Sequence, residues 1–267
     1  MLAQQTWVLT GAAGQVASSL RLPVAARVAR LRLVDVAPLE VRHPREEAMT
    51  ADLRDQQALV DALTGAHGVL HLGAMAEEAD FHDLAEVNIV GTFHVLEAAR
   101  RVGAKRVVYA SSNRVTGFYP TTTVVDPEMP PRPDGLYGVS KVAGEALGRL
   151  YADKFGLEVV NVRIGSFEKT PQDERQLSTW LSPDDCVAAF LAAMTAPDVR
   201  YATMYGVSRN TRRWWDLAAG QALGFEPHDD AERYAAELET GIPADPSAVQ
   251  GGAYASPEYT LDRQRPG

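Results

Sequence analysis

The chain has 267 residues, of which 46% are hydrophobic and 23% are charged, as is ordinary for a globular protein. Its formal net charge of -9 argues against a nucleic-acid partner and against an anionic membrane surface. The apolar run CVAAFLAAM at 186–194 is far shorter than the roughly 20 residues that span a bilayer. The six histidines show no metal-ligand spacing, so we expect no metal site.

Short apolar runs alternate with longer helical patterns along the chain. Strands are predicted at 6–10, 30–36, 67–72, 105–111, 157–164 and 202–207, and a further strand is implied before ADLRD at 51–55. Helices are predicted near 15–29, 54–64, 82–102, 137–155, 183–195 and 212–223. Several strands are apolar nearly throughout, as in a parallel sheet covered on both faces. The alternation predicts an α/β fold, a doubly wound Rossmann-type parallel sheet with helices on both faces.

Two irregular stretches interrupt this alternation, at 117–135 and 165–181, and both follow predicted strands. Ligands bind at such positions in open α/β sheets. The polar tail beyond residue 225 is too short for an independent domain. We therefore expect a single domain, 1–267, with a cofactor-binding part at about 1–165. A small C-terminal substrate-binding portion is expected from about 166–181 and 205–267.

Glycines open the first predicted helix directly after the first strand. Gly11 and Gly14 would let the backbone approach a pyrophosphate at the helix N-terminus, although alone they also fit an ordinary strand-to-helix turn. Asp35 ends the second strand, where a carboxylate accepts hydrogen bonds from ribose hydroxyls and repels a 2′-phosphate. Asp52 and Leu53 are expected at the adenine edge. With Gly73 and Ala74 placed as small residues beside the cofactor, these features predict NAD binding.

Tyr137 and Lys141 are four residues apart on a predicted helix and therefore share one face. An isolated pair of this kind is usually a packed tyrosine beside a solvated lysine. Here the serines of SSN, 111–113, end the preceding strand. We expect the lysine and an oxidised nicotinamide to lower the tyrosine pKa, so that the tyrosine accepts the proton of a carbinol while a hydride leaves.

At these residues the sequence resembles the extended branch of the short-chain dehydrogenase/reductase superfamily. The similarity lies in TGAAGQVA, Asp52–Leu53, HLGA, VNIVGT, ASSN and YGVSK. The resemblance implies catalysis by Ser112, Tyr137 and Lys141, the last two also touching the cofactor. It further implies cofactor contacts from Gln15, Val16, Leu72, Asn88, Ser111 and Ile164.

A narrower resemblance, to the uronate dehydrogenases, lies in SSNRVTGFYP, RPDGLYGVSK, VRIGS, RQLSTWLSPDD, YGVSRNTRRWWD and QGG. It implies oxidation of a cyclic uronate with NAD, an acidic sugar as the partner, sugar contacts from Asn113 and Ser166, and a carboxylate clamp at Arg175. Arg114 and Ala76 stand where that family has histidine and serine, and both are expected in the sugar pocket. We expect Arg114 to point inward beside Arg175.

Two other functions stay open: a sugar or sugar-nucleotide epimerase, dehydratase or reductase of the same superfamily, and a non-catalytic NAD-binding sensor. Apolar residues on more than one face of the 82–102 and 137–155 helices predict a homo-oligomer. The single cysteine, Cys186, cannot form an internal disulfide and is expected to pack in the core. No signal peptide precedes TWVLTGAAG, so we expect a cytoplasmic protein.

Overall fold

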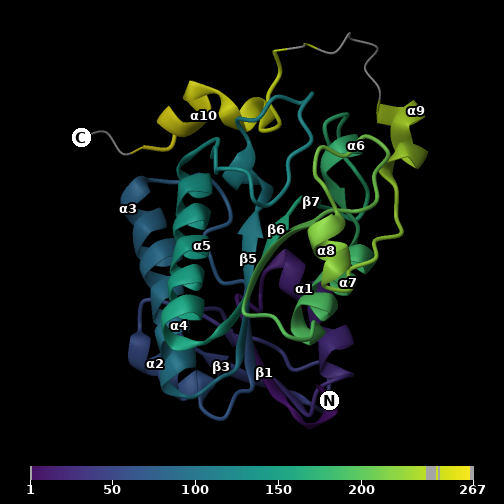
Figure 1. The fold of residues 1–267 in the computed structure, drawn as a ribbon. Helices are drawn as coiled ribbons and strands as arrows, with labels where there is room; N and C mark the ends of the chain where they lie inside the picture. Colours follow the sequence, from purple (N-terminus) through teal and green to yellow (C-terminus); the bar gives the residue numbers. More distant parts are fainter. Residues whose placement is uncertain (1, 239–244, 246, 265–267) are drawn as a thin grey trace.

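The computed structural model describes residues 2–238, 245 and 247–264, and a seven-stranded sheet lies at its centre (Figure 1). Neighbouring strands in the order β3-β2-β1-β4-β5-β6-β9 are all parallel. The chain runs outward from β1 in one direction and then returns through β4 toward the other edge, which confirms the doubly wound arrangement. The strands are Thr6–Thr10 (β1), Arg30–Asp35 (β2), Glu46–Thr50 (β3), Gly68–His71 (β4), Arg106–Ser112 (β5), Glu158–Ile164 (β6) and Tyr201–Gly206 (β9).

Helices cover both faces of this sheet. Figure 1 shows α2, α4 and α5 on one side and α1, α7 and α8 on the other. Within the described residues, none is both long and apolar enough to cross a membrane. The helices are Gln15–Ala25 (α1), Gln56–Leu63 (α2), Phe81–Leu84 (α3), Gly91–Arg101 (α4), Leu136–Phe155 (α5), Gln176–Thr179 (α6), Pro183–Thr195 (α7), Ala218–Ala222 (α8), Ala235–Leu238 (α9) and Pro257–Leu261 (α10).

The apolar strands supply a core on each side of the sheet. Val8, Val69 and Val107 are neighbours in the register and belong to one apolar cluster, while the next residue of each strand belongs to the other. This follows from the alternation of side chains along a strand. All seven residues of β5 are buried, which explains its uninterrupted apolar sequence up to Ala110. Each fully buried aliphatic side chain contributes roughly 1.5–3 kcal/mol.

The helix predicted over 82–102 is divided in three, because a π-helical segment, Ala85–Val90, separates α3 from α4. Thr92 Oγ1 donates to the carbonyl of Asn88 at 2.5 Å, and the Asn88 amide turns away to bond the Met75 backbone. π-Helical turns of this kind are frequent at functional sites. Here the widened turn brings Asn88 to the loop after β4.

The prediction of a helix over 212–223 is wrong for its first half, since α8 begins only at Ala218. Residues 214–216 are extended instead and are bound to Val125 through backbone hydrogen bonds. Trp215 is buried and stacks on Tyr205, with ring centroids 5.3 Å apart. Tertiary packing of a large aromatic ring therefore overrides the local helical pattern.

The irregular stretch 165–181 also contains regular structure, namely α6 and a small parallel pair formed by Ser166–Phe167 (β7) and Trp180–Leu181 (β8). The C-terminal helix α10 lies across the top of the molecule, over the carboxyl ends of the strands (Figure 1). Tyr259 and Thr260 attach it to the loop after β4, through hydrogen bonds of 2.9 Å to Glu77 and Glu78. Residues 165–181 and the helix α10 therefore both lie above the carboxyl ends of the strands.

Candidate active site

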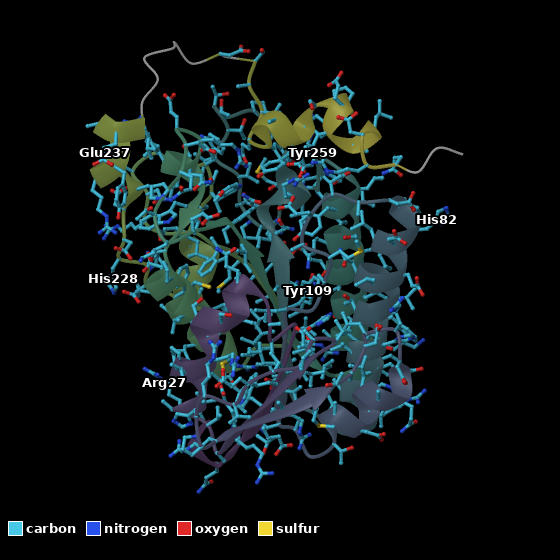
Figure 2. All side chains as sticks on the ribbon, turned by 180° about the vertical axis from the view of Figure 1, so that it is seen from behind. Arg27, His82, Tyr109, His228, Glu237 and Tyr259 are labelled. Atoms are coloured by element: carbon cyan, nitrogen blue, oxygen red, sulfur yellow. The ribbon has the colours of Figure 1, made fainter. Side chains whose placement is uncertain are left out.

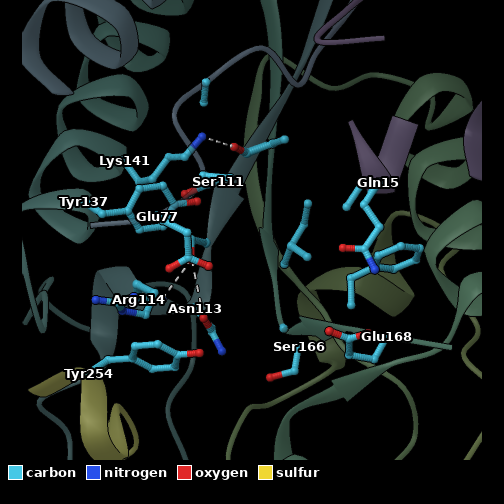
Figure 3. A pocket seen from close by; sticks show the side chains of 18 of the residues that line it. Gln15, Glu77, Ser111, Asn113, Arg114, Tyr137, Lys141, Ser166, Glu168 and Tyr254 are labelled. Atoms are coloured by element: carbon cyan, nitrogen blue, oxygen red, sulfur yellow. Dashed lines mark hydrogen bonds between the residues drawn. The ribbon is translucent and has the colours of Figure 1, made fainter. Parts of the chain in front are cut away.

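Two adjoining cavities open at the carboxyl ends of the strands, and Ala74 lines both. The first cavity, about 420 Å³, is lined by Gly11, Asp35, Asp52, Leu53 and Gly73 among others. The second cavity, about 290 Å³, is shown in Figure 3. Of the predicted site residues, its lining includes Gln15, Val16, Leu72, Ala76, Ser111, Ser112, Asn113, Arg114, Tyr137, Lys141, Ile164, Ser166 and Arg175. The structure thus gathers all but Gly14 and Asn88 of the predicted residues around these two cavities.

The first cavity has the features that a dinucleotide requires. Gly11 has a φ of +68°, and a side chain there would place its Cβ 2.6 Å from the backbone nitrogen of Gly73. Asp35 is held at the end of β2, because its carboxylate accepts the backbone N–H groups of Ala13 and Ala37, each at 3.0 Å. A carboxylate so placed fits a ribose with free hydroxyls.

Arg54 also lines the first cavity, although the sequence reasoning did not single it out. Its guanidinium donates to both carboxylate oxygens of Asp52, with a 2.6 Å contact to Oδ2, and this pairing lowers the pKa of Asp52. An arginine near an adenosine site would favour a 2′-phosphate if its charge were available. Here the guanidinium of Arg54 forms an ion pair with Asp52.

Asn88 is not among the residues that line either cavity, and its side chain is bound within the protein. Its Oδ1 accepts the N–H of Met75 at 2.8 Å, and its Nδ2 donates to the carbonyl of Met75 and to Ser140 Oγ. The side chain is 1% exposed. Asn88 therefore ties the loop after β4 to α5, and a direct contact with the cofactor stays a prediction.

The helix that carries Tyr137 begins on a carboxylate from a distant loop. Gly135 stands at the N-cap position of α5 and has no side chain to cap it. Glu78 takes this role: its carboxylate accepts the N–H groups of Leu136 at 2.8 Å and of Tyr137 at 3.1 Å. Glu78 is buried, and the sequence reasoning missed it because the partners are 58 and 59 residues away.

Tyr137, Ser112 and Lys141 meet in the second cavity, but their electrostatics differ from the prediction. Burial raises the pKa of Tyr137 to about 12, against which a hydrogen bond with Ser112 and the charge of Arg114 lower it. Lys141 lies over the tyrosine ring, 5.6 Å from its centroid, and donates to the carbonyl of Ala110. Burial lowers the pKa of Lys141 to about 8. Within the protein itself, burial therefore raises the pKa of Tyr137 by more than the neighbouring charges lower it.

Arg114 lines the second cavity, but its charge is engaged within the protein. Its Nε donates to Asp134, and its guanidinium lies 3.6 Å from the carboxylate of Glu78. The ring of Tyr254 covers it, with 4.3 Å between the guanidinium carbon and the ring centroid. Arg114 therefore lines the cavity as expected, with its Nε paired to Asp134, and its contact with a substrate carboxylate beside Arg175 stays a prediction.

Arg175 is not a solvated loop charge. Its Nε donates to the carbonyl of Gln250 at 2.8 Å, and the rings of Trp214 and Tyr254 lie 5.9 and 5.5 Å from its guanidinium carbon. Burial lowers its pKa. Asp134 and Asp173 favour its positive charge, whereas burial and Arg114 oppose it, and a planar guanidinium of this kind is suited to a ligand carboxylate.

The other predicted sugar contacts surround the same space. Asn113 is buried, and Ser166 Oγ lies 2.7 Å from Thr179 Oγ1. Ser111 lines the cavity, while its hydroxyl donates to Glu145 at 2.6 Å. Four further residues line this cavity: Glu77, Glu168 and Tyr254, which carry no motif and are labelled in Figure 3, and Gln176, which follows Arg175 in RQLSTWLSPDD.

The remaining candidate groups lie elsewhere. Cys186 is buried in the apolar core between the sheet and α1 and α7, and burial raises the pKa of its thiol. Figure 2 shows His82 and His228 on opposite sides of the molecule. Within the described part of the chain, no three histidine, cysteine or acidic side chains are grouped as metal ligands would be.

Known proteins share this sequence and fold. The NAD dependent epimerase/dehydratase family matches residues 7–170. The uronate dehydrogenase of Pseudomonas putida is 41% identical over 253 residues, which cover 93% of this chain and 94% of the relative. An NAD-dependent glucose-6-phosphate dehydrogenase of Haloferax volcanii is 36% identical, with coverage of 88% and 97%. The crystal structure of an Agrobacterium tumefaciens uronate dehydrogenase variant complexed with NAD has a TM-score of 0.89 and 41% identity, with coverage of 95% and 97%.

Proposed function

The chain belongs to the NAD dependent epimerase/dehydratase family, and on this basis we propose that it is an NAD-dependent uronate dehydrogenase. It oxidises the anomeric carbon of a cyclic uronate of the glucuronate or galacturonate type to an aldarolactone. One observation carries the proposal: the Tyr137–Ser112–Lys141 group and the guanidinium of Arg175 line one cavity. The similarity to uronate dehydrogenases over nearly the whole chain supports it.

NAD, when bound, supplies the acceptor of the hydride from the anomeric carbon. Asp35 accepts hydrogen bonds from the adenosine ribose, and Gly11 lets the backbone approach the pyrophosphate. Tyr137 takes the proton of the anomeric hydroxyl, while Ser112 donates a hydrogen bond to the same oxygen. The pKa of Tyr137, about 12, is too high for a base at neutral pH, so ionisation of this tyrosine depends on positive charge near its hydroxyl. Among the described residues, Arg114 and Lys141 lie against the Tyr137 ring.

Arg175 holds the uronate carboxylate at the other end of the sugar. A guanidinium forms two parallel hydrogen bonds with a carboxylate, which fixes the direction of the ring as well as its position. Asn113 and Ser166 bond the sugar hydroxyls from neighbouring walls of the cavity. The anomeric carbon is thereby placed at Tyr137, where orientation lowers the barrier to hydride transfer.

NADH formation with galacturonate and glucuronate tests this function, with galactose and glucose 6-phosphate as the neutral and doubly charged comparisons. We expect turnover with the uronates only, and a kcat/KM for NAD at least about tenfold above that for NADP, because Asp35 repels a 2′-phosphate. Turnover with glucose 6-phosphate alone would instead assign a phosphorylated aldose. Tight retention of NAD without net reduction would favour an epimerase, and binding of NAD without any turnover would favour a sensor.

We also propose that the chain forms one domain and acts in the cytoplasm as a homo-oligomer. Residues 166–181 and 205–267 would supply the substrate-binding portion, although 239–244, 246 and 265–267 lie outside the described residues. Exposed apolar side chains on α5, Leu150 at 49% and Phe155 at 47%, support self-association. Val90, directly before α4, is 44% exposed, and Phe93, in the first turn of α4, is 39% exposed. Light scattering of the purified protein measures the oligomeric state.

A further inference from the structure

The second cavity carries an acidic side chain at the end where oxidation takes place. Glu77 lines the cavity together with Tyr137, and Figure 3 shows its carboxylate between the tyrosine ring and Asn113. Tyr259, on α10, donates its hydroxyl to Glu77 Oε2 at 2.9 Å. The negative charge of Glu77 raises the pKa of Tyr137 and so acts at the site of the reacting oxygen.

The cations near this end do not neutralise Glu77. Arg114 lies against the rings of both Tyr137 and Tyr259, 5.7 and 5.4 Å from their centroids. Its own charge is taken up by Asp134, with Glu78 at 3.6 Å. Lys141 lies over the Tyr137 ring and donates to the carbonyl of Ala110. Within the described residues, neither Arg114 nor Lys141 forms an ion pair with Glu77.

The negative charge of Glu77 beside Tyr137 matters because of the chemistry of the product. Oxidation of a uronate, whose ring carries one carboxylate, gives a lactone that still has one. When water adds to the lactone carbonyl, the bond to the ring oxygen breaks, and a second carboxylate, a hydroxyl and a proton are formed. The new carboxylate is on the carbon that was oxidised, which lies next to Glu77 when the first carboxylate is on Arg175.

We propose that Glu77 is a charge filter at the oxidised end of the sugar, admitting monocarboxylate uronates and lactones and rejecting dicarboxylates such as the opened aldarate. The proposal rests on the uronate dehydrogenase function. Two carboxylates in contact repel each other, and because Glu77 is exposed, this repulsion is moderated by water and by salt. The filter keeps the enzyme free from inhibition by the stable end product of its own reaction.

Galactarate, the open-chain dicarboxylate, is the probe. Its affinity is measured by calorimetry on the NADH complex and, separately, as inhibition of galacturonate oxidation. We expect Glu77→Gln to bind galactarate at least about tenfold more tightly than the wild type does, and added salt to narrow this difference. Glu168→Gln is the matched control, since Glu168 lines the same cavity on the opposite side (Figure 3). Its galactarate affinity is expected to change less than about threefold, because screening weakens charges farther from the oxidised carbon.

Equal galactarate affinity of the wild type and Glu77→Gln would overturn the proposal, and so would an equal gain in Glu168→Gln, which would indicate only the total charge of the cavity. Glu77 is exposed, so the glutamine variant is expected to fold, and its melting temperature is compared with that of the wild type. A gain in galactarate affinity without any oxidation of uronates would refute the proposed function while leaving the filter in place. Oxidation of uronates without such a gain would refute the filter alone.

Discussion

Replacing Glu78 with alanine is expected to weaken the fold and the catalytic step together. The change removes the acceptor of two backbone N–H groups, those of Leu136 and Tyr137, and of the Thr260 hydroxyl. A buried donor without a partner costs about 1–3 kcal/mol, so the two N–H groups alone predict a loss of about 2–6 kcal/mol. For a chain of this size, each kcal/mol lowers the melting temperature by about 2–4 °C. The start of α5 would also shift, and small misplacement of Tyr137 is expected to reduce kcat by roughly a hundredfold.

Urea unfolding and steady-state NADH formation measure the two effects on the same protein. Glu78→Gln retains one oxygen acceptor and is expected to lose about 1–2 kcal/mol, between the wild type and the alanine variant. Glu237→Ala is the matched control, because Glu237 is an exposed glutamate on α9, far from α5 in Figure 2. If Glu78→Ala unfolded within about 0.5 kcal/mol of the wild type and kept its kcat, Glu78 would not anchor the catalytic helix.

Three further changes test the site. Tyr137→Phe removes the proton acceptor and is expected to lower kcat by about 10²–10⁴-fold while NAD still binds in calorimetry; a kcat within a few-fold of wild type would contradict the mechanism. Arg175→Lys keeps the charge but loses the planar pair of donors, so KM for galacturonate is expected to rise more than about tenfold, with little change in NAD affinity. Burial lowers the pKa of Lys141 from 10.5 to about 8, so its charge destabilises the fold below about pH 8, and this cost disappears as the pH rises to 10.5. Lys141→Met is therefore expected to abolish turnover yet raise the melting temperature near pH 7, with a smaller gain near pH 10; an equal gain at both values would show that the charge is not responsible.

The sequence alone determined the features that depend on neighbouring residues. Apolar strands such as 105–111 predict burial on both faces, because every second side chain meets a different layer of helices. Gly11 after the first strand and Asp35 at the end of the second predict the cofactor cavity, since the carboxyl ends of parallel strands meet at one edge. The four-residue spacing of Tyr137 and Lys141 places both on one helix face regardless of what surrounds the helix.

Tertiary structure alone decided which charges face the ligand. Arg114 and Arg175 both line the cavity, but the first forms an ion pair with Asp134, while the second donates to a carbonyl and lies near two aromatic rings. Glu78 caps the catalytic helix from another loop, and Trp215, packed on Tyr205, lies in extended chain where the first half of a helix was predicted. These outcomes depend on contacts between segments far apart in the chain. Local sequence patterns do not predict these contacts, because the free energy of a buried charge or ring depends on the residues that pack against it in the folded protein.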